Sequence, residues 1–185
     1  MIWKWAASTK KAAAGMAKIT GRFKELIIGE GGENIAPVPI EDSVKALVPG
    51  INECMMIGDK RKYNIALITL KAIGANGEIP GTDDLDAPAL TNFPGVKKIS
   101  EAMENKSVAD TITAAIQETN KNGKLVPNNS FKIQKFCILP TNFSEEAGEL
   151  TPTKKLKRAI VEKFYQKMVD KMYETDGTYI KFEKL

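Results

Sequence analysis

The chain has 185 residues, of which 43% are hydrophobic and 27% are charged, as in ordinary globular proteins and unlike disordered or fibrous ones. A domain of roughly 150 residues buries about 70% of the surface that its unfolded chain exposes, so the core needs neither disulfides nor metals. The absence of histidine excludes catalysis and metal ligation that depend on imidazole. A net charge of +4, from 27 basic and 23 acidic residues, does not indicate a nucleic-acid-binding protein.

The two cysteines, Cys54 and Cys137, lie far apart in separate apolar runs, without the spacing of a redox or metal motif. We expect buried free thiols, which fit a reducing compartment. No apolar run reaches the length of a membrane span, and the N-terminus lacks a secretory signal. The sequence therefore predicts a cytoplasmic protein, and it leaves open a peripheral contact with intracellular membranes.

The first half of the chain predicts a hairpin, a helix and two strands. Residues 25–28 and 34–36 are strand-like and flank the glycine cluster 29–32. A short helix is expected from Pro39 to the Pro49-Gly50 pair. Strands are expected over 51–57 and 63–70, and the second is apolar on both faces, as in the centre of a sheet.

The second half predicts a long loop and two longer helices. Residues 74–95 are rich in glycine, proline and aspartate and are expected to form a loop insertion. Helical spacing covers 107–120, and a strand is expected over 131–139. The clearest helical pattern covers 156–173, with one apolar stripe formed by Ile160, Phe164, Met168 and Met172. The fold class is therefore α+β, with a small sheet of four to five strands including a hairpin, flanked by about three helices.

Three features of the sequence could serve chemistry, and each also has a plain structural interpretation. The stretch from Gly21 to Asn34 combines an arginine with a glycine turn that could approach a phosphate, or it is an ordinary hairpin. Residues 150–158 hold four basic residues near the start of the last helix, which indicates an anionic ligand or a solvated basic face. The Trp3-Lys4-Trp5 segment could contact a membrane or nucleic acid, or it is a locally packed end.

Five phrases in one order resemble a known family. They are ITGRFKELII (19–28), GGENI (31–35), PIE (39–41), IGDKR (57–61) and LTPTKKLKR (150–158). Together they resemble the C-terminal domain of AMP-forming long-chain acyl-CoA synthetases, in the bubblegum-type branch of the adenylate-forming superfamily. The resemblance covers residues 19–173, the lid domain with its 74–95 insertion. Residues 1–18 are then an atypical basic lead-in, and residues 174–185 a C-terminal tail.

The resemblance implies a two-step ligase reaction. A fatty acid and ATP, with Mg²⁺, give acyl-AMP and pyrophosphate, and CoA then displaces AMP to form a thioester. The implied partner is an N-terminal adenylation domain, in cis or in trans, which supplies most of the ATP and fatty acid site. We expect the isolated chain to be inactive. The alternative is a non-catalytic module that binds a phosphate-bearing partner or an acidic membrane through its basic residues. A weaker alternative, an RNA-binding domain, is opposed by the near-balanced charge.

The resemblance also assigns roles to individual residues. Arg22 corresponds to the arginine that contacts the adenylate, and Lys24 to the hinge between the domains. The loop brought in for thioesterification corresponds to Gly31, Gly32, Glu33 and Asn34. Lys155 corresponds to the catalytic lysine of adenylation, and Lys154 is the alternative if the register shifts by one. No metal ligand is assigned.

Overall fold

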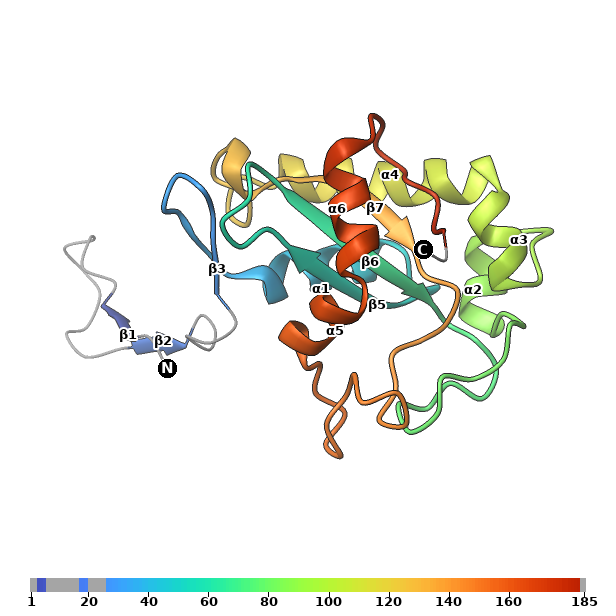
Figure 1. Ribbon diagram of the computed structural model, residues 1–185. Helices are drawn as coiled ribbons and strands as arrows, with labels where there is room; N and C mark the ends of the chain where they lie inside the picture. Colours follow the sequence, from blue (N-terminus) through green and yellow to red (C-terminus); the bar gives the residue numbers. More distant parts are fainter. Residues whose placement is uncertain (1–2, 6–16, 20–25, 184–185) are drawn as a thin grey trace.

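The computed structural model describes residues 3–5, 17–19 and 26–183, and Figure 1 shows their arrangement. Two pairs of short antiparallel strands lie in the N-terminal part: β1 (Trp3–Trp5) with β2 (Ala17–Ile19), and β3 (Ile27–Ile28) with β4 (Asn34–Ile35). The central sheet has three strands in the order β5-β6-β7: β5 (Ile51–Ile57), β6 (Asn64–Leu70) and β7 (Ile133–Ile138).

Strand β6 lies at the centre because both of its faces are apolar. It pairs antiparallel with β5 and parallel with β7, and all seven of its residues are buried. Side chains alternate along a strand, so Ala66 and Ile68 belong to the core on one face of the sheet, whereas Ile65 and Leu67 belong to the core on the other. The sheet therefore separates two hydrophobic cores.

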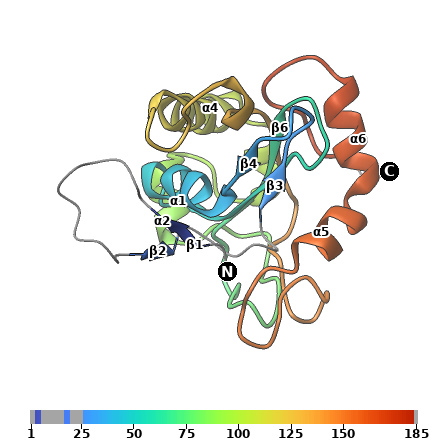
Figure 2. The same ribbon diagram turned by 90° about the vertical axis from the view of Figure 1, so that its left-hand side faces the viewer.

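Helices cover both faces of this sheet, as Figure 2 shows. Those described are α1 (Pro37–Leu47), α2 (Ala87–Asn92), α3 (Ile99–Glu104), α4 (Lys106–Lys121), α5 (Arg158–Phe164) and α6 (Gln166–Glu174). Buried residues of α1 to α4 join the core on one face, and those of α5 and α6 join the core on the other. None of the helices in the described ranges has the length and hydropathy needed to cross a membrane.

The predicted α+β class is confirmed, and so is the hairpin around the glycine cluster. Strand β5 has the predicted bounds, β6 begins one residue later than predicted, and α4 extends the predicted helix by one residue at each end. Both cysteines are buried and free, as expected.

The arrangement of the elements differs from the sequence prediction in four respects. The strands are divided among separate small sheets, and the described residues form more helices than about three. Segment 74–95, expected to be a loop, contains α2, because Asp86 caps the helix and Pro88 lies in its first turn. The long helix predicted over 156–173 is interrupted at Tyr165.

The apolar stripe predicted for that helix is also partly wrong. Ile160 and Phe164 are exposed, at 37% and 59%, whereas Val161, Met168 and Met172 are buried. At the interruption, the ring of Tyr165 lies against those of Phe143 and Phe182, at centroid distances of 6.4 and 6.3 Å. The buried residue of α5 is therefore Val161 and not a member of the predicted stripe.

The last described residues pack on the sheet. Thr178 and Ile180 exchange backbone hydrogen bonds with Phe136 of β7, and the ring of Tyr179 lies 5.1 Å from that of Phe136. Ile180 is buried in the same core as α6. This part of the 174–185 segment therefore contributes to the fold.

Candidate functional site

Lys155 lies on a narrow turn formed by residues 149–157, here called the lysine turn. The backbone amide of Thr151 donates to the carbonyl of Lys155 at 2.9 Å, and that of Lys157 donates to the carbonyl of Glu149 at 2.8 Å. The Thr151 hydroxyl accepts a hydrogen bond from the Lys155 amide at 3.0 Å. These bonds fix the backbone on both sides of Lys155, whose side chain is exposed.

Lys154 precedes Lys155 in a left-handed conformation, with φ of 57°. This conformation favours glycine, because a Cβ atom there crowds the following carbonyl oxygen. The Lys154 amide donates to the Thr151 carbonyl at 2.7 Å, which closes the turn. The two lysines are both exposed, but only Lys154 occupies the strained position.

The four basic residues of 154–158 do not form one anion-binding cluster. Arg158 donates two hydrogen bonds to the carboxylate of Glu41, at 2.7 and 2.5 Å, and this carboxylate also accepts from the Met56 amide at 2.6 Å. Glu41 is 4% exposed. Arg158 therefore anchors the end of the lysine turn to α1 and β5, so its guanidinium is already engaged.

Glu149 anchors the beginning of the lysine turn. Its side chain is buried and accepts a hydrogen bond from the Ser144 amide at 3.1 Å. Burial raises the pKa of Glu149, while its hydrogen bonds to the Ser144 amide and the Tyr165 hydroxyl act in the opposite direction. Buried carboxylates thus hold the lysine turn at both ends.

The second predicted site is the turn of residues 29–33, here called the glycine turn. It is closed by a hydrogen bond from the Gly29 amide to the Glu33 carbonyl at 3.1 Å, and Gly32 has φ of 83°, which glycine adopts without strain. The Glu30 amide donates to the Arg61 carbonyl at 3.2 Å. The glycine turn is therefore joined to the loop between β5 and β6.

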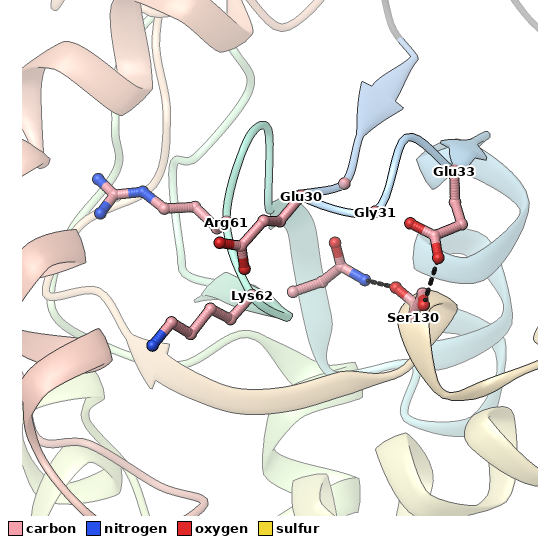
Figure 3. A pocket seen from close by; sticks show the side chains of 8 residues that line it. Glu30, Gly31, Glu33, Arg61, Lys62 and Ser130 are labelled. Atoms are coloured by element: carbon pink, nitrogen blue, oxygen red, sulfur yellow. Dashed lines mark hydrogen bonds between the residues drawn. The ribbon is translucent and has the colours of Figure 1, made fainter.

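A cavity of about 300 Å³ lies beside the glycine turn (Figure 3). Its lining residues are Gly29, Glu30, Gly31, Glu33, Arg61, Lys62, Asn64 and Ser130. Figure 3 shows Glu33 pointing toward Ser130, whose hydroxyl donates to the carboxylate at 2.9 Å, while Arg61 and Lys62 extend on the opposite side. The cavity thus combines exposed backbone with acidic and basic side chains.

Arg61 and Lys62 differ in how firmly they are held. Arg61 donates to Asp170 of α6 at 2.8 Å, and its guanidinium carbon lies 4.8 Å from the centre of the Tyr173 ring. Hydrogen bonds from the Gln166 amide and, to a smaller extent, from the Arg61 guanidinium lower the pKa of Asp170. Lys62 is exposed and carries the more accessible positive charge at the cavity.

The structure does not bring all predicted site residues together. Figures 1 and 2 show the glycine turn, beside β3, and the lysine turn, before α5, at well-separated ends of the molecule. Gly31, Gly32, Glu33 and Asn34 lie in or beside the glycine turn, and Lys155 lies alone at the other end. Arg22 and Lys24 fall outside the described residues. No group of three or more Cys, Asp or Glu side chains in the described ranges could hold a metal ion.

The fold is that of the C-terminal region of adenylation domains. The adenylation domain of a carboxylate reductase from Mycobacterium chelonae aligns with a TM-score of 0.62 and 18% identity over 86% of this chain and 21% of that protein. The A domain of a carboxylic acid reductase from Segniliparus rugosus, solved with AMP and a carboxylic acid, aligns with a TM-score of 0.61 and 17% identity over 85% of this chain and 21% of that protein. At this level of identity the likeness is one of fold.

Sequence similarity gives a finer assignment. Residues 24–83 match the family described as the AMP-binding enzyme C-terminal domain. The chain is homologous to the C-terminal region of long-chain fatty acid–CoA ligases: it is 45% identical to ligase ACSBG2 of Gallus gallus, over 89% of this chain and 22% of that protein, and 41% identical to ligase ACSBG1 of Homo sapiens, over 88% of this chain and 23% of that protein. The chain therefore spans about a fifth of the length of these curated relatives.

Sequence reasoning did not anticipate two contacts of the lysine turn. Glu41 and Arg158 both lie in phrases that suggested the family, but nothing in their spacing indicates that they pair. Gly77, in the segment expected to be an insertion loop, lies against Lys154. Both contacts depend on how the core brings distant segments together.

Proposed function

We propose that this chain acts as the C-terminal lid of an AMP-forming long-chain fatty acid–CoA ligase, completed by an N-terminal adenylation domain in cis or in trans. Homology to such ligases over most of the chain supports this proposal. The observation that carries it is the separation of the two turns (Figures 1 and 2). Since one fixed placement of the lid would bring only one of them to a reacting centre, the two turns fit two successive half-reactions.

In the first half-reaction, the lysine turn would face the bound ATP and fatty acid. The fatty acid carboxylate attacks the α-phosphorus of ATP, and pyrophosphate leaves. The ammonium group of Lys155 would neutralise negative charge on the oxygens of the transferring group and of the carboxylate. Because the turn fixes the backbone of Lys155 beforehand, little reorganisation is needed when the charge develops.

In the second half-reaction, the glycine turn would face the acyl-AMP. The CoA thiol attacks the acyl carbonyl carbon, its proton is lost, and AMP leaves. The cavity beside Gly31 and Glu33 offers backbone surface for the pantetheine arm of CoA, and Lys62 offers an exposed positive charge for a CoA phosphate. We assign Mg²⁺ and most of the ATP site to the N-terminal domain. Arg22 would contact the adenylate from the lid.

The alternative, a module that binds a phosphate-bearing partner or an acidic membrane, has less support. It uses Lys154, Lys155, Lys157 and Arg158 as one basic cluster. The engagement of Arg158 by the buried Glu41 removes one member of that cluster. With Arg158 engaged, the arrangement fits one catalytic lysine on the lysine turn better than a basic cluster of four residues.

The test of this function is a chimera in which this chain replaces the matching C-terminal region of the Gallus gallus relative. We expect the chimera to form acyl-AMP and acyl-CoA from a long-chain fatty acid, ATP and CoA, because the lid supplies the groups that the N-terminal part lacks. Radiolabelled fatty acid and thin-layer separation measure both products. The N-terminal part alone is the control. A folded chimera no more active than this control would contradict the proposed function.

The hinge at Lys24 gives a second prediction. Rotation of the lid requires free backbone torsions there, whereas proline fixes φ near −65° and restricts the preceding residue. In the chimera, Lys24→Pro is expected to retain most acyl-AMP formation but to slow transfer from preformed acyl-AMP to CoA by about 10-fold or more. Lys24→Ala, the control for loss of the side chain, is expected to affect both steps only mildly. Equal loss of the two half-reactions in Lys24→Pro would argue against a hinge at this position.

A further inference from the structure

The loop of residues 73–82, here called the support loop, lies against the segment that leads into the lysine turn. The Glu145 amide donates to the Gly77 carbonyl at 2.9 Å, and the Glu146 amide donates to the Glu78 carbonyl at 3.0 Å. Figure 1 shows the support loop, which follows β6, beside the loop that precedes α5. Backbone hydrogen bonds thus join the support loop to residues 145 and 146, which precede the lysine turn in the chain.

The support loop is held together by hydrogen bonds of its own. The side-chain oxygen of Asn76 accepts hydrogen bonds from the amides of Glu78 and Ile79, at 2.8 and 3.1 Å. The Thr82 amide donates to the Ile73 carbonyl at 2.9 Å, which brings the ends of the loop together. Because these bonds fix the conformation of the loop beforehand, little conformational entropy is lost when it contacts its neighbour, and the loop can support that neighbour.

At Gly77 the support loop lies against the lysine turn. A Cβ atom at this position would lie 3.1 Å from Cδ of Lys154 and 3.5 Å from Cδ1 of Leu150. Leu150 forms the base of the turn through its bridge with Leu156. The absence of a side chain at Gly77 therefore allows the loop to contact both the base of the turn and the residue before Lys155.

We propose that the support loop positions the lysine turn for adenylate formation, with Gly77 as the positioning residue through its contact with Lys154. This inference rests on the proposed function, in which Lys155 serves the first half-reaction. Lys154 occupies a strained conformation next to Lys155, so a contact that restricts its side chain also limits the conformations open to the turn. A Cβ atom at Gly77 would lie 3.1 Å from Cδ of Lys154, so the Lys154 side chain would have to shift by a few tenths of an ångström, and this shift alters the restraint.

The test compares Gly77→Ala with Gly95→Ala. Both glycines have positive φ, 85° and 83°, so alanine introduces similar backbone strain at each, but nothing lies within 4 Å of a Cβ at Gly95. In the chain by itself, Gly77→Ala is expected to speed hydrogen exchange at the amides of Lys154, Lys155 and Lys157 by about 10-fold, whereas Gly95→Ala leaves them unchanged. In the chimera, Gly77→Ala is expected to slow acyl-AMP formation by about 10-fold.

Transfer from preformed acyl-AMP to CoA should remain unchanged in Gly77→Ala, because the glycine turn lies at the other end of the molecule. In a Lys154→Ala background, Gly77→Ala should have less than about 2-fold effect on acyl-AMP formation, since the two residues act through one contact. Equal effects of Gly77→Ala and Gly95→Ala on exchange or on acyl-AMP formation would overturn the inference. So would equal loss of the two half-reactions. An inactive unsubstituted chimera would instead count against the proposed function. In that case, hydrogen exchange in Gly77→Ala and Gly95→Ala would still test whether Gly77 restrains the lysine turn through Lys154.

Discussion

Lys155→Ala in the chimera is expected to reduce acyl-AMP formation by about 100-fold or more, the effect of removing a preorganised group that stabilises transition-state charge. The lysine turn holds the backbone of Lys155 through two hydrogen bonds: the Lys155 amide donates to the Thr151 hydroxyl, and the Thr151 amide donates to the Lys155 carbonyl. No neighbouring lysine can therefore take its place without rearranging the turn. Transfer from preformed acyl-AMP to CoA should be nearly unaffected. Single-turnover formation of acyl-AMP and of acyl-CoA, measured separately, tests both statements.

Two neighbouring substitutions serve as controls for Lys155. Lys154→Gly removes the side chain that lies against Gly77 but allows the left-handed conformation of this position without strain, so acyl-AMP formation is expected to fall by no more than about 10-fold, well short of the loss in Lys155→Ala. Lys157→Ala should also cost much less than Lys155→Ala. If Lys154→Gly instead caused the 100-fold loss, the catalytic position would be one residue earlier. If all three variants lost activity equally, the basic residues would act only as a charged surface.

The central sheet was predictable because its signals are local. Strand β5 follows Pro49-Gly50 and ends at Ile57, directly before Gly58, so turn residues mark both of its ends. Strand β6 contains apolar residues on both faces, which is the pattern of a strand buried on both sides. The division of the strands into separate sheets was not predictable, since pairing depends on partners far away in the chain.

The last helix shows where periodicity misleads. Apolar residues recur at helical spacing from Ile160 to Met172, and a bend at one residue does not alter this spacing. At the interruption, the ring of Tyr165 packs against Phe143 and Phe182, contacts that no local pattern reveals. Phe164, the last residue of α5, is exposed although the periodicity predicts that it is buried.

The candidate site was predictable only in its local parts. The glycine cluster and the Thr-Pro-Thr-Lys-Lys phrase each form a turn, as their composition suggests. What holds these turns in place comes from elsewhere: the loop between β5 and β6 for the glycine turn, and α1 and the support loop for the lysine turn. Turn chemistry is encoded by adjacent residues, whereas the orientation of a turn depends on the whole core.

Glu41→Ala is expected to lower the free energy of unfolding by about 3–5 kcal/mol, the usual effect of removing one partner of a buried ion pair. The Glu41 side chain is 5% exposed, and its carboxylate accepts two hydrogen bonds from Arg158 and one from the Met56 amide. Alanine deprives the Arg158 guanidinium of this carboxylate and leaves a buried amide without its acceptor. Urea unfolding followed by circular dichroism measures the change. The dependence of the unfolding free energy on urea concentration, the m-value, is fitted as one shared value for all variants.

Two further variants serve as controls. Glu41→Gln removes the charge of Glu41 but nearly keeps its shape, and Asp110→Ala breaks an ion pair that is exposed instead of buried. Glu41→Gln keeps an oxygen for the Met56 amide but loses the charge facing Arg158, so a smaller loss of about 1–3 kcal/mol is expected. Asp110→Ala removes the partner of Lys106 from an exposed pair on α4, with side chains 64% and 87% exposed, and should change the stability by no more than about 0.5 kcal/mol. The expected order of destabilisation is thus Glu41→Ala, then Glu41→Gln, then Asp110→Ala. If Glu41→Ala were no more destabilising than Asp110→Ala, the Glu41–Arg158 pair would not anchor the lysine turn to α1.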